Sequence, residues 1–315
     1  LGAAAMAGPA RAEGGARVLV GAGGAVTRYT LDNGLEVLLQ EDHQVPLVTV
    51  SVGYHVGSAD DPEGRSGLAH LCEHLMFRGS KHVSESPQGV LSDAGAVHHN
   101  GATTFHETSY FETMPRVSLQ TALWLESDRM GFLLDALDDE KLQGEREVVK
   151  NERRQLFDAA PYGLAEERLW QALFPRPHPY GGLVIGSLQD LDRATLADVR
   201  AFFQRHYTAS NATLAIVGDF DPPAARQLIA RYFGTLPRRP RAEPREVPPV
   251  LLDREVVLEH LERVGTAPKV VLAWHSPAEL EPADAAAAVL ASVLSASRAS
   301  RLPRRLLGQG GLATS

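Results

Sequence analysis

The stretch Ser66-Gly-Leu-Ala-His-Leu-Cys-Glu-His-Leu-Met-Phe77 decides which fold and which chemistry to expect of this chain. His70 and His74 are four residues apart, so on a helix their imidazoles lie on one face and can reach one metal ion together. Glu73 directly precedes the second histidine, close enough to polarise a water at that metal. The order inverts the commoner His-Glu-x-x-His zinc motif. The stretch therefore predicts a metal-binding helix that carries its own base.

A short pattern of this kind also arises by chance, and the alternative is a core helix with polar residues turned to solvent. The neighbouring residues favour the metal site, because the helix is apolar on most of its circumference and should be buried. These apolar residues are Leu68, Ala69, Leu71, Cys72, Leu75, Met76 and Phe77. Buried histidines and a buried glutamate need partners, and a metal supplies them.

A catalytic zinc ion needs a third protein ligand. The best candidates lie in residues 138–157, which read as one amphipathic helix. Glu145 and Glu152 are two helical turns apart, so they share a face that would pack on the first helix and point two carboxylates at the histidines. Glu147 falls on another side and should be solvated. The segment by itself does not choose between Glu145 and Glu152.

Several segments outside this motif match the sequences of one protein family. In that family, His-x-x-Glu-His is followed by a ligand glutamate at a spacing that Glu152 satisfies. The matching segments are Tyr54–Ser58, Gly64–Gly67, Phe77–Ser80, Asn100–Thr104, Thr108–Phe111, Ile185–Leu191 and Asn211–Phe220. The chain therefore resembles the pitrilysin/insulinase family of zinc metallopeptidases. It is most similar to the bacterial two-domain peptidases and the mitochondrial-processing-type subunits.

The resemblance implies a zinc-dependent endopeptidase that hydrolyses peptides or unfolded polypeptide segments. It implies one zinc ion per chain, with His70, His74 and Glu152 as ligands and Glu73 as general base. Glu145 would be a supporting carboxylate near the site. The alternative is a non-catalytic or partner-dependent subunit of a heteromeric peptidase, in a homo- or heterodimer with a second peptidase-like subunit.

Residues 100–111 alternate like a strand. By the resemblance, this strand edges the active cleft and receives the substrate as an added strand, with Asn100, Ala102 and Thr103 in contact with it. The alternative is an ordinary core strand. The sequence Phe105-His-Glu-Thr108 departs from the Phe-Asp-Arg-Thr that relatives commonly carry, which puts the charge preference of the family in doubt here.

The resemblance implies an α+β fold: a mixed, mostly antiparallel sheet flanked by helices, followed by the start of a second similar domain. We expect a leader at 1–16, a catalytic zinc peptidase domain at 17–235, a Pro/Arg-rich linker at 236–250 and an incomplete second domain at 251–315. Helices are expected at 66–77, 87–94, 118–134, 138–157 and 162–173, and strands of the second domain at 255–261 and 269–274.

Composition fits a soluble globular protein, with 44% hydrophobic and 22% charged residues among 315. The net charge of −8 argues against a nucleic-acid partner and suits basic or neutral peptides. No apolar run approaches the length of a membrane span. Residues 1–12 are small and apolar and resemble the tail of a signal peptide, the alternative being a flexible leader. We therefore expect a periplasmic or secreted protein.

Overall fold

The computed structural model describes residues 10–11, 16–21, 24–84, 86–265, 267–309 and 313. The chain forms two compact units, of which the first runs to Pro248 and includes Glu259–Thr266. The second holds α9 (Pro282–Ser295), α10 (Arg301–Pro303) and the π-helical turn Arg304–Gln309. Apart from residues 10, 11 and 16, the leader expected at 1–16 lies outside the described residues.

The first unit is built on one mixed sheet with the strand order β1-β2-β3-β4-β8-β5-β7-β6. Neighbouring strands run antiparallel, except for β4 and β8, which pair in parallel. The prediction of a mixed, mostly antiparallel sheet is confirmed. The strands are β1 (Ala10–Arg11), β2 (Arg17–Gly21), β3 (Gly24–Thr30), β4 (Glu36–Glu41), β5 (Leu47–Tyr54), β6 (His98–Thr103), β7 (Thr108–Pro115) and β8 (Ala212–Gly218).

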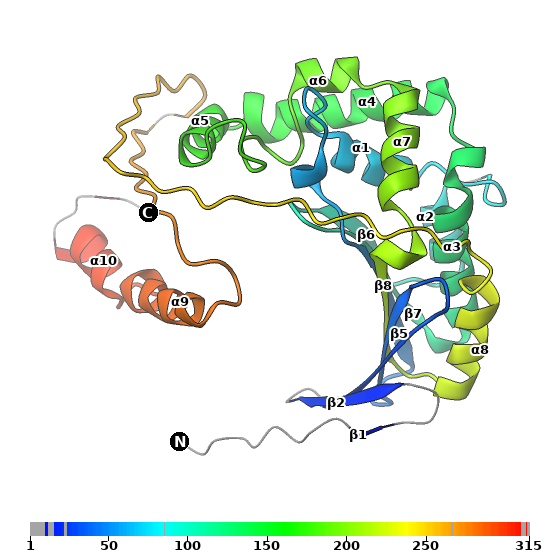
Figure 1. The fold of residues 1–315 in the computed structure, drawn as a ribbon. Helices are drawn as coiled ribbons and strands as arrows, with labels where there is room; N and C mark the ends of the chain where they lie inside the picture. Colours follow the sequence, from blue (N-terminus) through cyan, green and yellow to red (C-terminus); the bar gives the residue numbers. More distant parts are fainter. Residues whose placement is uncertain are drawn as a thin grey trace. The chain divides into compact units, whose positions relative to one another are not determined.

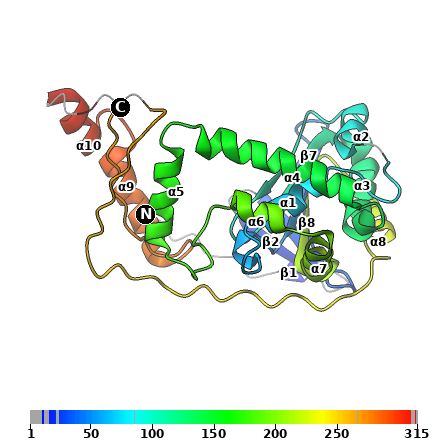
Figure 2. The same ribbon diagram turned by 90° about the horizontal axis from the view of Figure 1, so that it is seen from above.

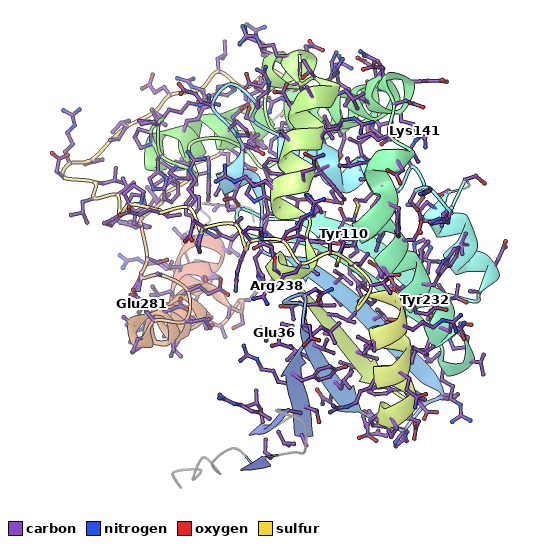
Figure 3. The ribbon with its side chains drawn as sticks, turned by 45° about the vertical axis from the view of Figure 1, so that its right-hand side comes forward. Glu36, Tyr110, Lys141, Tyr232, Arg238 and Glu281 are labelled. Atoms are coloured by element: carbon purple, nitrogen blue, oxygen red, sulfur yellow. The ribbon has the colours of Figure 1, made fainter. Side chains whose placement is uncertain are left out.

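Helices cover one face of the sheet, as Figures 1 and 2 show. The helices of the first unit are α1 (Leu68–Leu75), α2 (Pro87–Asp93), α3 (Leu119–Phe132), α4 (Asp139–Arg153), α5 (Gly163–Leu173), α6 (Leu188–Arg193), α7 (Leu196–His206) and α8 (Pro222–Tyr232), of which α5 lies away from the sheet. The strands alternate accordingly: Val48, Val50 and Val52 of β5 are buried, while the residues between them are half-buried. Tyr110 of β7 points into the same core (Figure 3). None of the described helices has both the length and the apolar character that crossing a membrane requires.

Two predicted strand regions differ from the structure. Residues 100–111 form a hairpin rather than one strand, because Thr104 N–H donates to the Glu107 carbonyl oxygen at 2.7 Å and closes a turn between β6 and β7. Residues 255–261 and 269–274 form no strand. A strand needs a neighbour for its backbone hydrogen bonds, and among the described residues neither segment has one.

The Pro/Arg-rich segment expected as a linker has no regular structure over residues 236–250, apart from the end of a turn at its start. Its backbone and side chains are nevertheless tied to the first unit. Arg245 Nη1 donates to the carbonyl oxygens of Ala59 and Asp61 at 2.6 and 3.1 Å, and Ser210 Oγ donates to the Arg239 carbonyl oxygen at 2.7 Å. The domain limits stated above remain a prediction.

Candidate active site

Helix α1 presents the histidine motif from inside the first unit. It begins after Gly67, whose φ of 89° is a left-handed conformation that suits glycine. Its first turn is capped from a distance: the Asp61 carboxylate accepts hydrogen bonds from Gly67 N and Ala69 N at 2.7 and 2.8 Å. The apolar side of α1, including Leu71 and Cys72, is fully buried. This packing fixes the direction in which the polar side points.

Helix α4 lies beside α1 and brings a carboxylate to both histidines (Figure 2). Glu152 Oε2 lies 3.3 Å from His74 Nε2 and 3.8 Å from His70 Nε2. The ligand atoms of the three residues all lie within 4.8 Å of one another. Ligands at zinc–ligand distances of about 2.1 Å in a tetrahedron are about 3.4 Å apart. The three side chains thus converge on one point, with the Glu152–His74 distance close to that of a zinc-bound pair and the Glu152–His70 distance somewhat longer.

The protonation states of Glu152 and His70 also suit a metal. Glu152 Oε2 is buried without a well-formed hydrogen bond from any described residue, although both Nε2 atoms face it. Contact with His74 lowers the pKa of Glu152 despite its partial burial. Burial lowers the pKa of His70 to about 4, so its imidazole is neutral and can offer a lone pair. This donor set fits zinc.

Glu145 contacts His74 at Nδ1, the ring nitrogen that does not face Glu152. Its Oε2 lies 3.2 Å from His74 Nδ1, and its Oε1 lies 3.3 Å from Arg78 Nε. Burial alone would lower the pKa of His74, but the interactions with Glu145 and Glu152 raise it to about 9. A carboxylate on the far nitrogen orients a histidine and strengthens it as a ligand. Glu147, by contrast, is exposed and pairs with Lys150, as expected of a solvated side chain.

Glu73 stands next to this group with one carboxylate oxygen anchored. Thr103 Oγ1 of β6 donates a 2.6 Å hydrogen bond to Glu73 Oε2. A Cβ atom on Gly101 would lie 3.0 Å from Glu73 Oε1, so the missing side chain leaves room for the carboxylate. Burial raises the pKa of Glu73, and the Thr103 hydrogen bond opposes that rise. The sequence pattern gave no sign of this threonine–glutamate pair.

These residues line a cleft of about 1250 Å³ between α1, α4 and β6. The lining includes the three residues expected to contact substrate, Asn100, Ala102 and Thr103, with Thr103 also bonded to Glu73. β6 is the last strand in the sheet order, so among the described residues its outer edge pairs with no strand. Lys141 lines the cleft from the start of α4 (Figure 3). The arrangement brings together three candidate metal ligands, an adjacent carboxylate and a free strand edge, which are the groups that a metal-dependent peptidase would need.

The comparisons with known proteins agree with this class. Residues 36–179 match the family described as Insulinase (Peptidase family M16), and residues 193–315 match the Peptidase M16 inactive domain. The chain is 32% identical over 209 residues to the zinc protease PqqE of Helicobacter pylori, covering 66% of this chain and 46% of that protein. The chain belongs to the pitrilysin/insulinase family of peptidases.

Solved structures show the same fold. A protease from Helicobacter pylori superimposes with a TM-score of 0.74 at 27% identity, covering 91% of this chain and 69% of that one. The periplasmic protease PqqL from Escherichia coli gives a TM-score of 0.63 at 26% identity, covering 71% of this chain and 25% of that one.

A further relative carries the name of a subunit. Mitochondrial-processing peptidase subunit beta of Blastocladiella emersonii is 25% identical over 213 residues, covering 68% of this chain and 44% of that protein. The chain spans about half the length of the curated relatives it matches.

Proposed function

We propose that this protein is a zinc-dependent endopeptidase that hydrolyses peptides or unfolded polypeptide segments. The observation that carries the proposal is the convergence of His70, His74 and Glu152, with ligand atoms within 4.8 Å of one another, beside the anchored carboxylate of Glu73. Relatives named as zinc proteases support the same reading.

Zinc would be held by His70, His74 and Glu152, one ion per chain. When bound there, it would polarise the scissile carbonyl and lower the pKa of a water to about 7. Glu73 would accept a proton from the attacking water through Oε1, since Oε2 is held by Thr103. It would then give that proton to the leaving amine, a role that typically contributes 10²–10⁴-fold in rate.

The free edge of β6 would hold the peptide. Added strands gain affinity from main-chain hydrogen bonds and selectivity from side-chain pockets. Asn100 and Ala102 line the cleft on this strand, next to Gly101, whose lack of a side chain lets a backbone come close to Glu73. We therefore propose that Asn100, Ala102 and Thr103 border the bound peptide.

A partner-dependent form of this activity has support of its own. One relative is by name a subunit of the mitochondrial-processing peptidase, and the chain spans about half the length of its relatives. A second peptidase-like half, from a homo- or heterodimer partner, would complete the substrate chamber. The match to periplasmic PqqL supports a periplasmic location.

The test is zinc content together with cleavage of a mixed peptide library. We expect one zinc per chain, cleavage that stops when a chelator removes the metal, and recovery when zinc is added back. Cleavage that continues in the metal-free protein would contradict the proposal. Zinc binding without cleavage, until a family partner is added, would favour the partner-dependent form.

A further inference from the structure

Aromatic side chains gather at one end of the cleft, where the β6–β7 turn meets α5. The rings of Phe105 and Trp170 are nearly parallel, with an interplanar angle of 7° and centroids 5.5 Å apart. The Tyr180 ring lies 4.6 Å from that of Phe105. Phe105 and Trp170 both line the cleft and both are half-buried, so part of each ring faces the open space.

Hydrogen bonds hold this cluster in place. Trp170 Nε1 donates to the Tyr180 carbonyl oxygen at 2.6 Å, which satisfies the only polar atom of the indole. The Tyr180 hydroxyl is hydrogen-bonded to His106 Nε2, across from the β6–β7 turn to the segment after α5. The rings therefore present apolar faces in a fixed orientation, which lowers the entropic cost of binding a further apolar group.

The lining of the cleft becomes more apolar toward the carboxyl end of α4. It runs from the charged Lys141 and Glu145, past Glu152, to the apolar Leu156 and Phe157, which follow α4 in the chain. Leu156 is 55% exposed, so its side chain is accessible from the cleft that it lines. The end of the cleft beyond the metal ligands is thus apolar, and the aromatic rings form part of its lining.

The position of Phe105 just beyond the end of β6 indicates which part of a peptide would reach the rings. Gly101 lies against Glu73, and Phe105 follows four residues later, so their Cα atoms are at most about 13 Å apart at a strand rise of about 3.3 Å per residue. A peptide added antiparallel to β6 would run from the Phe105 end toward His98. Its residues on the amino-terminal side of the cleaved bond would then meet the rings.

We infer that Phe105 and Trp170 form a subsite for an aromatic or bulky aliphatic side chain of the peptide, two to four residues to the amino-terminal side of the cleaved bond. This inference rests on the proposed function. The carboxylate in the same turn, Glu107, lies against Gly53 of β5 and does not line the cleft, so it offers a basic side chain no charge partner beside the rings.

Binding tests the subsite without relying on catalysis. Labelled peptides that differ only in one residue (Phe, Leu, Ala, Lys or Asp, placed in turn at each of the three positions) are titrated against zinc-loaded Glu73→Gln protein by fluorescence anisotropy. At one position we expect the Phe and Leu peptides to bind about tenfold more tightly than the Ala peptide. Equal affinities, or a preference for Lys or Asp, would overturn the inference.

Variants tie the preference to the rings. Trp170→Ala in the same background should abolish the preference for the Phe and Leu peptides over the Ala peptide, and Trp170→Leu, which keeps more of the packing, should weaken it. Trp274→Ala is the matched control, because Trp274 is 77% exposed and belongs to the second unit, and it should keep the full preference. A preference that persists in folded Trp170→Leu and Trp170→Ala proteins would overturn the subsite.

The two proposals fail separately. Wild-type protein that shows the binding preference but cleaves no peptide contradicts the peptidase proposal and leaves the subsite supported. Cleavage that depends on zinc, with no preference at any of the three positions, contradicts only the subsite.

Discussion

Thr103 Oγ1 donates a 2.6 Å hydrogen bond to Glu73 Oε2, linking the edge strand β6 to the carboxylate beside the metal ligands. Thr103 Oγ1 also lies 3.5 Å from Thr108 Oγ1, whose hydroxyl donates to the Val56 carbonyl oxygen at 3.0 Å. The Thr103 hydroxyl has one proton, and the carboxylate at 2.6 Å is a nearer and stronger acceptor than the Thr108 hydroxyl at 3.5 Å, so that proton is directed to Glu73. The Glu73 carboxylate is thereby oriented by the strand on which we propose that the peptide binds.

Replacing Thr103 should therefore impair turnover more than binding. We expect Thr103→Val to lower kcat by about 10–100-fold, the usual effect of losing a group that orients a metal-site residue, with zinc content unchanged. Thr103→Ser keeps the hydroxyl and should recover most of the loss. Steady-state kinetics with metal analysis measures this, and wild-type kcat in the valine variant would contradict the orienting role.

Glu145 should act on metal affinity. Glu145→Gln keeps the shape but removes the negative charge beside His74 Nδ1, so we expect zinc to bind about 10–100-fold more weakly. Competition with a chromogenic chelator gives the affinity. Glu147→Gln, on the exposed side of the same helix, is the control and should bind zinc like the wild type.

A buried charge cluster under the site should matter for stability. Glu126 and Arg129 of α3 are fully buried and paired, with Arg129 Nε 2.8 Å from Glu126 Oε2, and the Arg129 guanidinium lies over the Tyr110 ring at 4.1 Å. Arg129→Met would leave two buried carboxylates, Glu126 and Glu112, without the cation that interacts with both. We expect a loss of about 3–5 kcal/mol in the free energy of unfolding.

Urea unfolding measures that loss. Glu147→Gln, which breaks an exposed ion pair with Lys150, should change the free energy of unfolding by no more than about 0.5 kcal/mol. Equal losses in the free energy of unfolding from the two substitutions would contradict a larger stabilising role for the buried pair.

Asp190 should make stability depend on pH. Burial alone would raise its pKa, but hydrogen bonds with Ser66 and Ser187 outweigh burial and hold the pKa below the usual value of an aspartate. A carboxylate whose pKa is lower in the folded state contributes stability above the unfolded-state pKa and loses it as pH falls through the folded-state value. The free energies of unfolding of wild type and Asp190→Asn, measured by urea titration, should therefore differ most above about pH 5 and converge toward pH 3. A constant difference across this range would contradict this role.

The parts of the site that follow from local periodicity could be predicted from the sequence. The spacing of His70 and His74 set them on one face of α1, and the two-turn spacing of Glu145 and Glu152 set both on the face of α4 that meets the histidines. Thr195 and Asp198 are three residues apart, the spacing of a capping box, and they form one at the start of α7. Each of these relations spans only a few turns of one helix.

Relations between distant segments could not be predicted in this way. The Asp61 cap reaches α1 across a loop, and the Thr103–Glu73 bond depends on where the β6–β7 turn falls. The turn was missed because Thr104–Glu107 lacks the glycine or proline that usually marks one. Arg129 reads as a surface charge on a helix, and only the sheet packing buries it.

The central claim is that Glu73 is the base of a zinc peptidase, and Glu73→Gln tests it most directly. The measurement is zinc content and peptide hydrolysis on the same purified protein. We expect one zinc per chain, as in the wild type, and hydrolysis reduced by at least about 10²–10⁴-fold. Hydrolysis at the wild-type rate by the zinc-loaded variant would contradict the claim.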